Sequence, residues 1–358
     1  MRVASVDLGT NSTRLLVADT NGTMEEVVRR LAITRLGEGV DERRRLLPLP
    51  IARVRNVLSE YRRELELLGA ERTLCIGTSA LRDAENGEAF LGEIAWSYGF
   101  TTRLLTGEEE AALTLRGIGA VEPDTLVVDI GGGSTELQVV GTDVRVSLDV
   151  GCVRLTERFG EDVEAVREYV RGLLPEAEPK RAVGVAGTVT TIAALDLGLA
   201  EYDPERIHGH SISTKAAGEQ TARLASLTVE ERAQIVEPGR APVIVAGAAI
   251  LTEILDFYDL DAIEASERDI LHGAALAAAE LPEPEEGAAL PARTPAAERL
   301  IRTLAHRESV GHSQKMSEPA WDRELVMTSL ILSSDVVANT ARIVERLEEE
   351  RGEEAEED

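Results

Sequence analysis

Two stretches of the chain combine an aspartate with a turn of glycine and hydroxyl residues, a combination suited to phosphate and metal chemistry. The first runs from Val6 to Val17 and contains Asp7; the second runs from Val128 to Val139 and contains Asp129. They align without a gap, and seven of the twelve positions are identical. Glycine lets backbone N–H groups approach a phosphate closely, and the aspartate beside the turn can hold a divalent cation or a water.

Each stretch predicts a β-hairpin, because an apolar strand is followed by a turn and a second apolar strand. Asp7 and Asp129 are 129 − 7 = 122 residues apart, about one domain, so we expect two domains of related fold. Residues on the two strands of a hairpin can face each other, so Asp129 and Glu136 can point into one cleft. Arg14 takes the place of Glu136 in the first copy, and alternation alone does not decide which face it occupies.

Strands and helices alternate elsewhere in the chain. We expect strands at 72–77, 101–105 and 181–186, with helices to about Ser97, from Gly107 and after Gly187. Residues 243–247 are expected to repeat the order of strand, glycine and helix. This alternation predicts α/β units with partly parallel sheets, and the ligand is then expected at the strand ends, between the domains.

A third phosphate-binding candidate is the segment from Gly187 to Thr191, which we expect at the start of a helix. Free N–H groups and the positive end of the helix dipole favour anions there. An ordinary helix cap with exposed hydroxyls is the alternative.

Composition excludes several classes of protein. The chain has 65 acidic and 38 basic residues, a formal charge of −27, which argues against surface-wide binding of nucleic acid or anionic membrane. Cys75 and Cys152 lack the spacing of a disulfide framework or a zinc site. Asp7 interrupts the position where a signal peptide needs apolar residues, and the apolar run 243–251 is too short to cross a bilayer. We therefore expect a cytoplasmic protein.

Five motifs occur in order, at residues 7–14, 79–86, 107–111, 129–136 and 187–191. Together they resemble the exopolyphosphatase / guanosine pentaphosphate phosphatase family over about residues 1–280. The resemblance implies an α/β fold of two ribonuclease H-like domains, as in the actin-like ATPase superfamily, with a cleft between them. The domains are expected at 1–120 and 121–281, followed by a linker, a helical extension and an acidic tail in 282–358. This length matches the short type of the family.

The resemblance also implies a function. It implies a Mg²⁺-dependent hydrolase that removes the terminal phosphate of inorganic polyphosphate, of guanosine pentaphosphate, or of both, and that forms a homodimer. An ATPase or small-molecule kinase of the same superfamily is the nearest alternative. A non-catalytic sensor of polyphosphate or of the guanosine nucleotide is another.

The site residues carried over by the resemblance fall into three groups. Glu110 is the expected catalytic base, whereas Glu109 is explained by a capping box with Thr106. Arg82 is the expected catalytic arginine on the phosphate, although a surface ion pair with Asp83 or Glu85 is an alternative. The expected metal ligands are Asp129, Glu136 and Asp7, and the expected phosphate-binding residues are Asn11, Ser12, Thr13, Gly132, Gly133, Ser134, Gly187 and Thr188.

Overall fold

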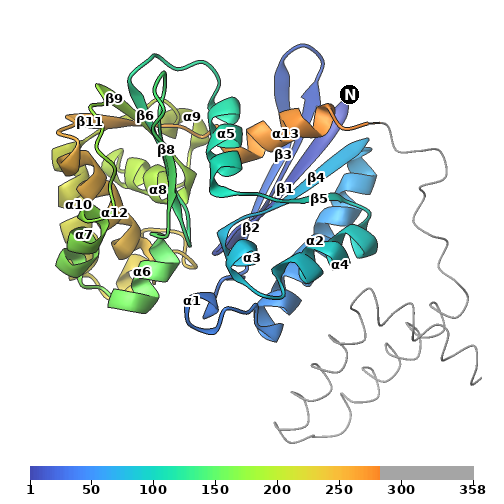
Figure 1. Ribbon diagram of the computed structural model, residues 1–358, viewed down its shortest axis with the longest axis horizontal. Coiled ribbons are helices and arrows are strands. Elements are labelled where there is room, and N and C mark those ends of the chain that lie inside the picture. Colours follow the sequence, from blue (N-terminus) through green and yellow to red (C-terminus); the bar gives the residue numbers. More distant parts are fainter. Residues whose placement is uncertain (283–358) are drawn as a thin grey trace, which may run out of the picture. The chain divides into compact units, whose positions relative to one another are not determined.

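The structure is a computed structural model that describes residues 1–282 (Figure 1). Residues 1–88 and 100–281 form one compact unit that contains two β-sheets, and Ala89–Gly99 falls outside this unit. The helices and the acidic tail expected at the C-terminus lie outside the described residues.

The first sheet is built from the N-terminal part of the chain. Its strand order is β3-β2-β1-β4-β5; β2 is antiparallel to β1 and to β3, whereas β4 is parallel to both β1 and β5. The elements are β1 (Arg2–Leu8), β2 (Ser12–Thr20), β3 (Met24–Ile33), α1 (Val40–Arg43), α2 (Pro48–Leu68), β4 (Arg72–Gly77), α3 (Ser79–Asp83), α4 (Gly87–Tyr98), β5 (Thr101–Leu104) and α5 (Gly107–Ile118).

The second sheet repeats this arrangement. Its order is β10-β11-β9-β6-β7-β8. Strand β7 is antiparallel to both β6 and β8, and β9 is parallel to both β6 and β11. The elements are β6 (Thr125–Ile130), β7 (Thr135–Val139), β8 (Arg145–Leu148), α6 (Cys152–Phe159), α7 (Val163–Arg171), β9 (Arg181–Val185), α8 (Ala186–Asp196), α9 (Pro204–Ile207), β10 (Ser211–Ser213), α10 (Thr214–Ser226), α11 (Val229–Arg232), α12 (Ile244–Phe257), β11 (Ala262–Ala265) and α13 (Ile270–Ala279).

The two expected hairpins are confirmed. Asp7 lies opposite Arg14 on β1 and β2, and Asp129 lies opposite Glu136 on β6 and β7. Each hairpin is followed by a third antiparallel strand and then by parallel strands on the other side of β1 or β6. The shared strand order agrees with the related folds predicted from the repeat.

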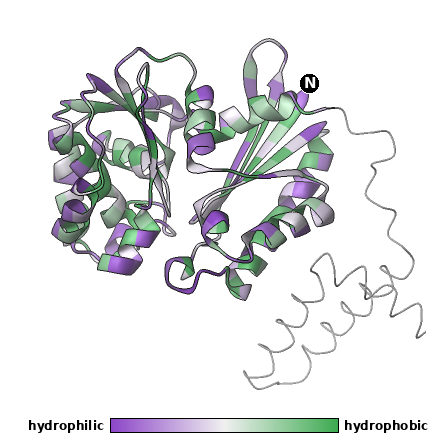
Figure 2. Ribbon diagram, viewed as in Figure 1, coloured by the Kyte–Doolittle hydropathy of each residue, from purple (hydrophilic) through white to green (hydrophobic). Residues whose placement is uncertain are grey.

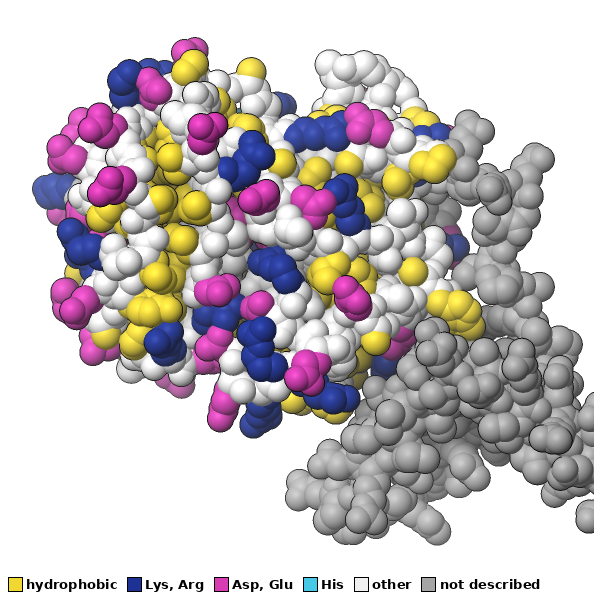
Figure 3. Space-filling model, in the orientation of Figure 1, with side chains coloured by type: hydrophobic (Ala, Val, Ile, Leu, Met, Phe, Trp, Pro, Cys, Tyr) yellow, Lys and Arg dark blue, Asp and Glu magenta, His cyan; other side chains and the backbone are white. Residues whose placement is uncertain are grey.

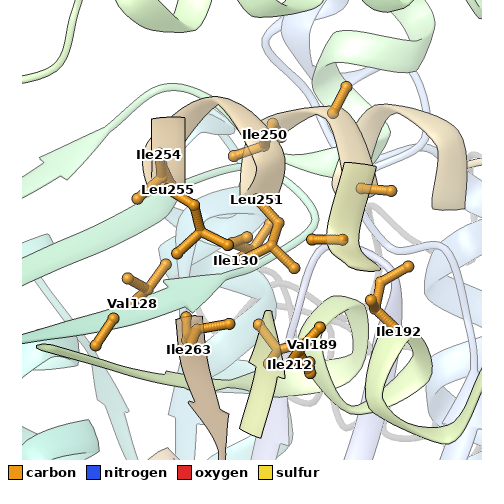
Figure 4. Close-up of a cluster of buried hydrophobic side chains, with 14 of the residues drawn as sticks. Val128, Ile130, Val189, Ile192, Ile212, Ile250, Leu251, Ile254, Leu255 and Ile263 are labelled. Atoms are coloured by element: carbon orange, nitrogen blue, oxygen red, sulfur yellow. The ribbon is translucent and has the colours of Figure 1, made fainter. Parts of the chain in front are cut away.

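Helix α12 packs against the second sheet through apolar side chains. Ile250, Leu251 and Ile254 pack with Val128 and Ile263 of the strands (Figure 4). Figure 2 shows green and purple residues along the strands and purple residues on many outer helix faces. The expectation of a strand at residues 243–247 is wrong, since α12 begins at Ile244. A short apolar run fits a buried helix as well as a buried strand.

Helix α13 follows the second sheet in sequence but packs in the core of the first. Ile270, Leu271 and Ala274 share a buried cluster with Val3 and Leu74. The helix approaches α5 closely, because a Cβ atom on Gly273 would overlap the carbonyl oxygen of Leu113. The chain therefore crosses between the sheets after α5 and again before α13.

Two expectations about the described residues concern membranes and cysteines. Between residues 1 and 282, the helices are all too short or too polar to cross a membrane. Cys75 and Cys152 are both buried and free.

Candidate active site

A cavity of about 80 Å³ lies where the turns of the two hairpins meet. Its walls come from β1, β2, β6 and β7, and from the starts of α3, α5 and α8. Most of the residues expected from the sequence line it: Asp7, Asn11, Ser12, Glu110, Asp129, Gly132, Gly133, Ser134, Glu136, Gly187 and Thr188.

Glycine in the second turn permits the two turns to touch. A Cβ atom on Gly132 would lie 2.9 Å from Cβ of Thr10, and one on Gly133 would lie 2.8 Å from Oγ1 of Thr10. Real Cβ atoms essentially never approach other atoms this closely. The sequence therefore places glycine where the two turns pack against each other.

Glu110 projects into the cavity from the first turn of α5. Thr106 and Glu109 form the predicted capping box. The Thr106 N–H donates to the Glu109 carboxylate at 2.8 Å, and the Glu109 N–H donates to the Thr106 hydroxyl at 3.2 Å, so Glu109 is occupied in capping the helix. Glu110 is buried and accepts a hydrogen bond from Arg82, which also donates to the carbonyl of Leu105 at 2.9 Å. Burial raises the pKa of Glu110 well above its usual value, Glu136 adds to this rise, and Arg82 opposes it.

Asp129 and Glu136 form a facing pair of buried carboxylates. Asp129 accepts a hydrogen bond from Thr114 at 3.1 Å, and Glu136 accepts one from Ser147 at 2.7 Å. Burial, followed by the charge of Glu136, raises the pKa of Asp129 to about 8. Two adjacent carboxylates with raised pKa values are suited to a bound cation.

Arg14 lines the cavity and is paired with carboxylates, which settles the face that it occupies. Its Nε and Nη2 atoms lie 2.9 and 2.6 Å from Oδ2 of Asp7, and Nη1 donates to Asp269. The other oxygen of Asp7, Oδ1, is buried and has no hydrogen-bond partner. Among residues 1–282, no three His, Cys, Asp or Glu side chains group closely enough to hold a metal ion by themselves.

Two expected residues lie differently from the rest. Thr13 is fully buried, and its hydroxyl lies 2.9 Å from that of Thr34, so it does not line the cavity. Alternation along β2 turns this side chain away while Ser12 and Arg14 face the cavity. Arg82 does not line the cavity either. It forms an ion pair with Glu110, which does, rather than with Asp83 or Glu85.

Arg240 is a cavity residue that the sequence did not reveal. It precedes α12 in a tight turn, where its N–H lies 2.9 Å from the carbonyl oxygen of Glu237. A Cβ atom on Gly187 would overlap its guanidinium, so the group lies against the start of α8, where the first turn contains no acidic residue. Within the described residues no carboxylate pairs with it. Burial lowers the pKa of Arg240, and a bound anion would balance its charge together with the positive helix end.

Arg154 on α6 is a second residue that the sequence did not reveal. Its Nε donates to the carbonyl of Gly133 at 2.7 Å, and its Nη atoms donate to Asp41 of α1 and Asp83 of α3. It therefore ties the second hairpin turn to the helices of the first sheet. Only its position in the fold, among the many arginines of this sequence, distinguishes it.

The two sheets of matching strand order define a protein of the actin-like ATPase fold. Residues 15–280 match the Ppx/GppA phosphatase family. The chain belongs to this family.

Relatives of known name support this membership. The chain is 38% identical over 314 residues to exopolyphosphatase 2 of Mycobacterium tuberculosis, covering 78% of this chain and 98% of that protein. It is 29% identical over 279 residues to the guanosine-5'-triphosphate,3'-diphosphate pyrophosphatase of Vibrio vulnificus, covering 73% of this chain and 56% of that protein. The solved structure of the Aquifex aeolicus family member aligns with a TM-score of 0.65 and 31% identity, covering 78% of this chain and 97% of that one.

Proposed function

We propose that this chain is a phosphohydrolase that releases the terminal phosphate of inorganic polyphosphate, of guanosine pentaphosphate, or of both. The names of the exopolyphosphatase and pyrophosphatase relatives support this proposal. The observation that carries it is the cavity in which Glu110 faces a carboxylate pair and two contacting glycine-rich turns. Such an arrangement can hold a phosphate and orient a water in one place.

The proposed base is Glu110. A water attacks the terminal phosphorus, the bond from phosphorus to the bridging oxygen breaks, and Glu110 takes the proton of the water. A raised pKa makes its carboxylate a stronger base, which suits this role. The proposed role of Arg82 is to favour the charged carboxylate and to offset negative charge on the phosphate.

The phosphate oxygens are proposed to meet two sets of donors. One consists of the touching hairpin turns, with backbone N–H groups and polar side chains of Asn11, Ser12, Gly132, Gly133 and Ser134. The other is the start of α8 at Gly187 and Thr188, where Arg240 adds a fixed positive charge. Thr13 is left out, because its hydroxyl is buried against Thr34.

Asp129 and Glu136 are the proposed Mg²⁺ ligands, and Asp7 is the proposed third carboxylate through its unpartnered Oδ1. These residues suit Mg²⁺, because Mg²⁺ prefers one or two carboxylates, retained waters and phosphate oxygens over a site made of protein ligands alone. No three such side chains group closely enough in residues 1–282 to hold an ion by themselves, so waters and phosphate oxygens would have to complete the proposed site. When bound, Mg²⁺ would offset the charge of the phosphates.

Phosphate release with and without Mg²⁺ tests this function for the wild type, Glu110→Gln and Glu109→Gln. The substrates are polyphosphate, guanosine pentaphosphate and ATP. Glu110→Gln is expected to lower kcat by on the order of 10²- to 10⁴-fold, because the general base is lost. Glu109→Gln is the matched control and should retain turnover, since Glu109 caps α5.

Each alternative gives a different result. Binding of polyphosphate without turnover by the wild type would indicate a sensor. Transfer of phosphate to an acceptor other than water would indicate a kinase. Full activity of Glu110→Gln would contradict its role as the base.

The remaining expectations concern organisation. We propose two ribonuclease H-like domains with a boundary near residue 120, with α13 returning to the first sheet, and a homodimer without nucleic-acid or membrane partners. Sedimentation of the full chain tests the proposed dimer.

A further inference from the structure

Three consecutive arginines, Arg43, Arg44 and Arg45, stand exposed at the end of α1. Within residues 1–282, none of them forms an ion pair or a side-chain hydrogen bond. Their three positive charges stand together in a chain of net charge −27. Figure 3 shows Lys and Arg side chains interspersed with Asp and Glu side chains over the lower part of the surface.

The backbone holds these arginines in a defined place. Glu85 N–H donates to the carbonyl of Arg44 at 2.8 Å, and Leu46 N–H donates to Oδ1 of Asn86 at the same distance. Leu46 itself is buried. The three side chains are thus displayed from an anchored turn, although their charges have no partner in the described fold.

The segment that precedes the three arginines, residues 37–41, contacts the wall of the cavity. Gly37 N–H donates to the carbonyl of Thr10 at 2.8 Å, and Thr10 lines the cavity. Arg154 then bridges Gly133 of the cavity wall to Asp41, which is two residues before Arg43. The arginines therefore follow directly, in the chain, a segment that contacts the wall of the proposed active site.

The size of the cavity requires most of a long substrate to lie outside it. Its volume is about 80 Å³, whereas sites that enclose a drug-sized ligand measure about 300–1,000 Å³. Only the end of a phosphate chain fits, and the rest of a polyanion needs a positively charged surface near the opening. Arginine suits this task, because its planar fork binds phosphate oxygens in pairs and remains charged.

We propose that Arg43, Arg44 and Arg45 bind the part of a linear polyphosphate that lies outside the cavity. This proposal rests on the proposed phosphohydrolase function and adds a second binding region to it. The region offers local positive charge on an acidic protein, so it favours long chains over substrates that end within the cavity.

The test compares R43Q/R44Q/R45Q with R181Q/R206Q/R223Q, a control that removes the same charge from exposed positions that do not line the cavity. Initial rates are measured on long-chain polyphosphate, tripolyphosphate and guanosine pentaphosphate at several salt concentrations. R43Q/R44Q/R45Q should raise KM for the long chain about tenfold, since three exposed charge contacts are lost. For the long chain, log(kcat/KM) falls with log salt, and this negative slope should become shallower by about two in R43Q/R44Q/R45Q, because three contacts with a linear polyanion are lost.

Short substrates and the control variant decide the result. Tripolyphosphate and guanosine pentaphosphate should be hydrolysed as by the wild type, and the control should leave all three substrates unchanged. Equal losses on short and long substrates, equal losses in the control, or an unchanged KM for the long chain would overturn the proposal. Absence of phosphate release by the wild type from every substrate would instead contradict the proposed function.

Discussion

Single residues in the cavity differ in how their charges are balanced. Arg14 is held by Asp7 and Asp269, and Arg82 is held by Glu110, so both have partners before any substrate arrives. Arg240 has none among the described residues, and it lies against the start of α8. A partly buried cation beside a positive helix end is stabilised when an anion binds between them. The charge balance therefore points to Arg240 as the arginine that gains most from a phosphate.

Substitution of Arg240 should weaken substrate use strongly. Arg240→Gln is expected to lower kcat/KM by roughly 10- to 100-fold, because a charge-assisted contact with the phosphate is lost. Arg240→Lys keeps the charge but not the fork, so it should fall between the wild type and Arg240→Gln. Rates of phosphate release measure the effect, with Arg206→Gln as an exposed control. An Arg240→Gln enzyme with wild-type kcat/KM would show that this residue does not contact substrate.

The site residues that could be predicted are those that belong to short motifs. Asp129 and Glu136 face each other because a hairpin fixes cross-strand neighbours within eight residues of sequence. Arg240 lines the cavity, and Arg154 contacts its wall at Gly133, only after the second sheet has folded against the first. Thr13 shows the opposite case, since its motif is intact but the pleat of β2 turns its hydroxyl toward Thr34.

At the scale of elements, helix α6 joins the two halves of the cavity through Arg154. The guanidinium is largely buried and pairs with Asp83 of α3 and Asp41 of α1 while holding the carbonyl of Gly133. Arg154 therefore holds the second hairpin turn in place and also sets its distance from the helices of the first sheet. We expect such a link to affect both stability and phosphate binding.

Arg154→Gln should destabilise the fold by about 1–2 kcal/mol, because the partly buried Asp83 loses its charge partner. It should also raise KM, since the turn at Gly133 loses a fixed hydrogen bond. Urea unfolding and phosphate release measure the two effects. In a double-mutant cycle, Asp83→Asn combined with Arg154→Gln should cost less than the sum of the single changes. Additive losses would mean that the two groups are not coupled.

Elements were predicted well where turns and glycines delimit them, and less well inside apolar runs. Strands β4, β5 and β9 begin at the expected residues, because each is bounded by polar residues or glycine. The sequence predicts a strand where α12 begins, because residues 243–247 are apolar or glycine at every position and carry no periodicity. The return of α13 to the first sheet depends on contacts with β1 and α5, which no local pattern encodes.

At the scale of the whole molecule, a network of charges connects α13 to the strands of the first sheet. Asp269 at the start of α13 pairs with Arg14 of β2, and Glu267 pairs with Arg29 of β3 at 2.7 Å. His272 lies 2.8 Å from Glu26 of β3 through its Nε2 atom. These pairs join residues more than 200 positions apart, so they act on the stability of the complete fold.

Protonation of His272 should therefore make stability depend on pH. Burial alone would lower the pKa of His272, but hydrogen bonds and charges from Asp269 and Glu26 outweigh it and raise the pKa above the ordinary value. The stabilisation is complete below the unfolded pKa of about 6.5 and is lost as pH rises through the folded pKa. His272→Gln should thus cost about 2 kcal/mol near pH 5.5 and distinctly less near pH 9. Urea unfolding at both pH values measures this, and Glu26→Gln should reduce the same pH-dependent part. An equal loss at the two pH values would contradict a charged His272 in the folded protein.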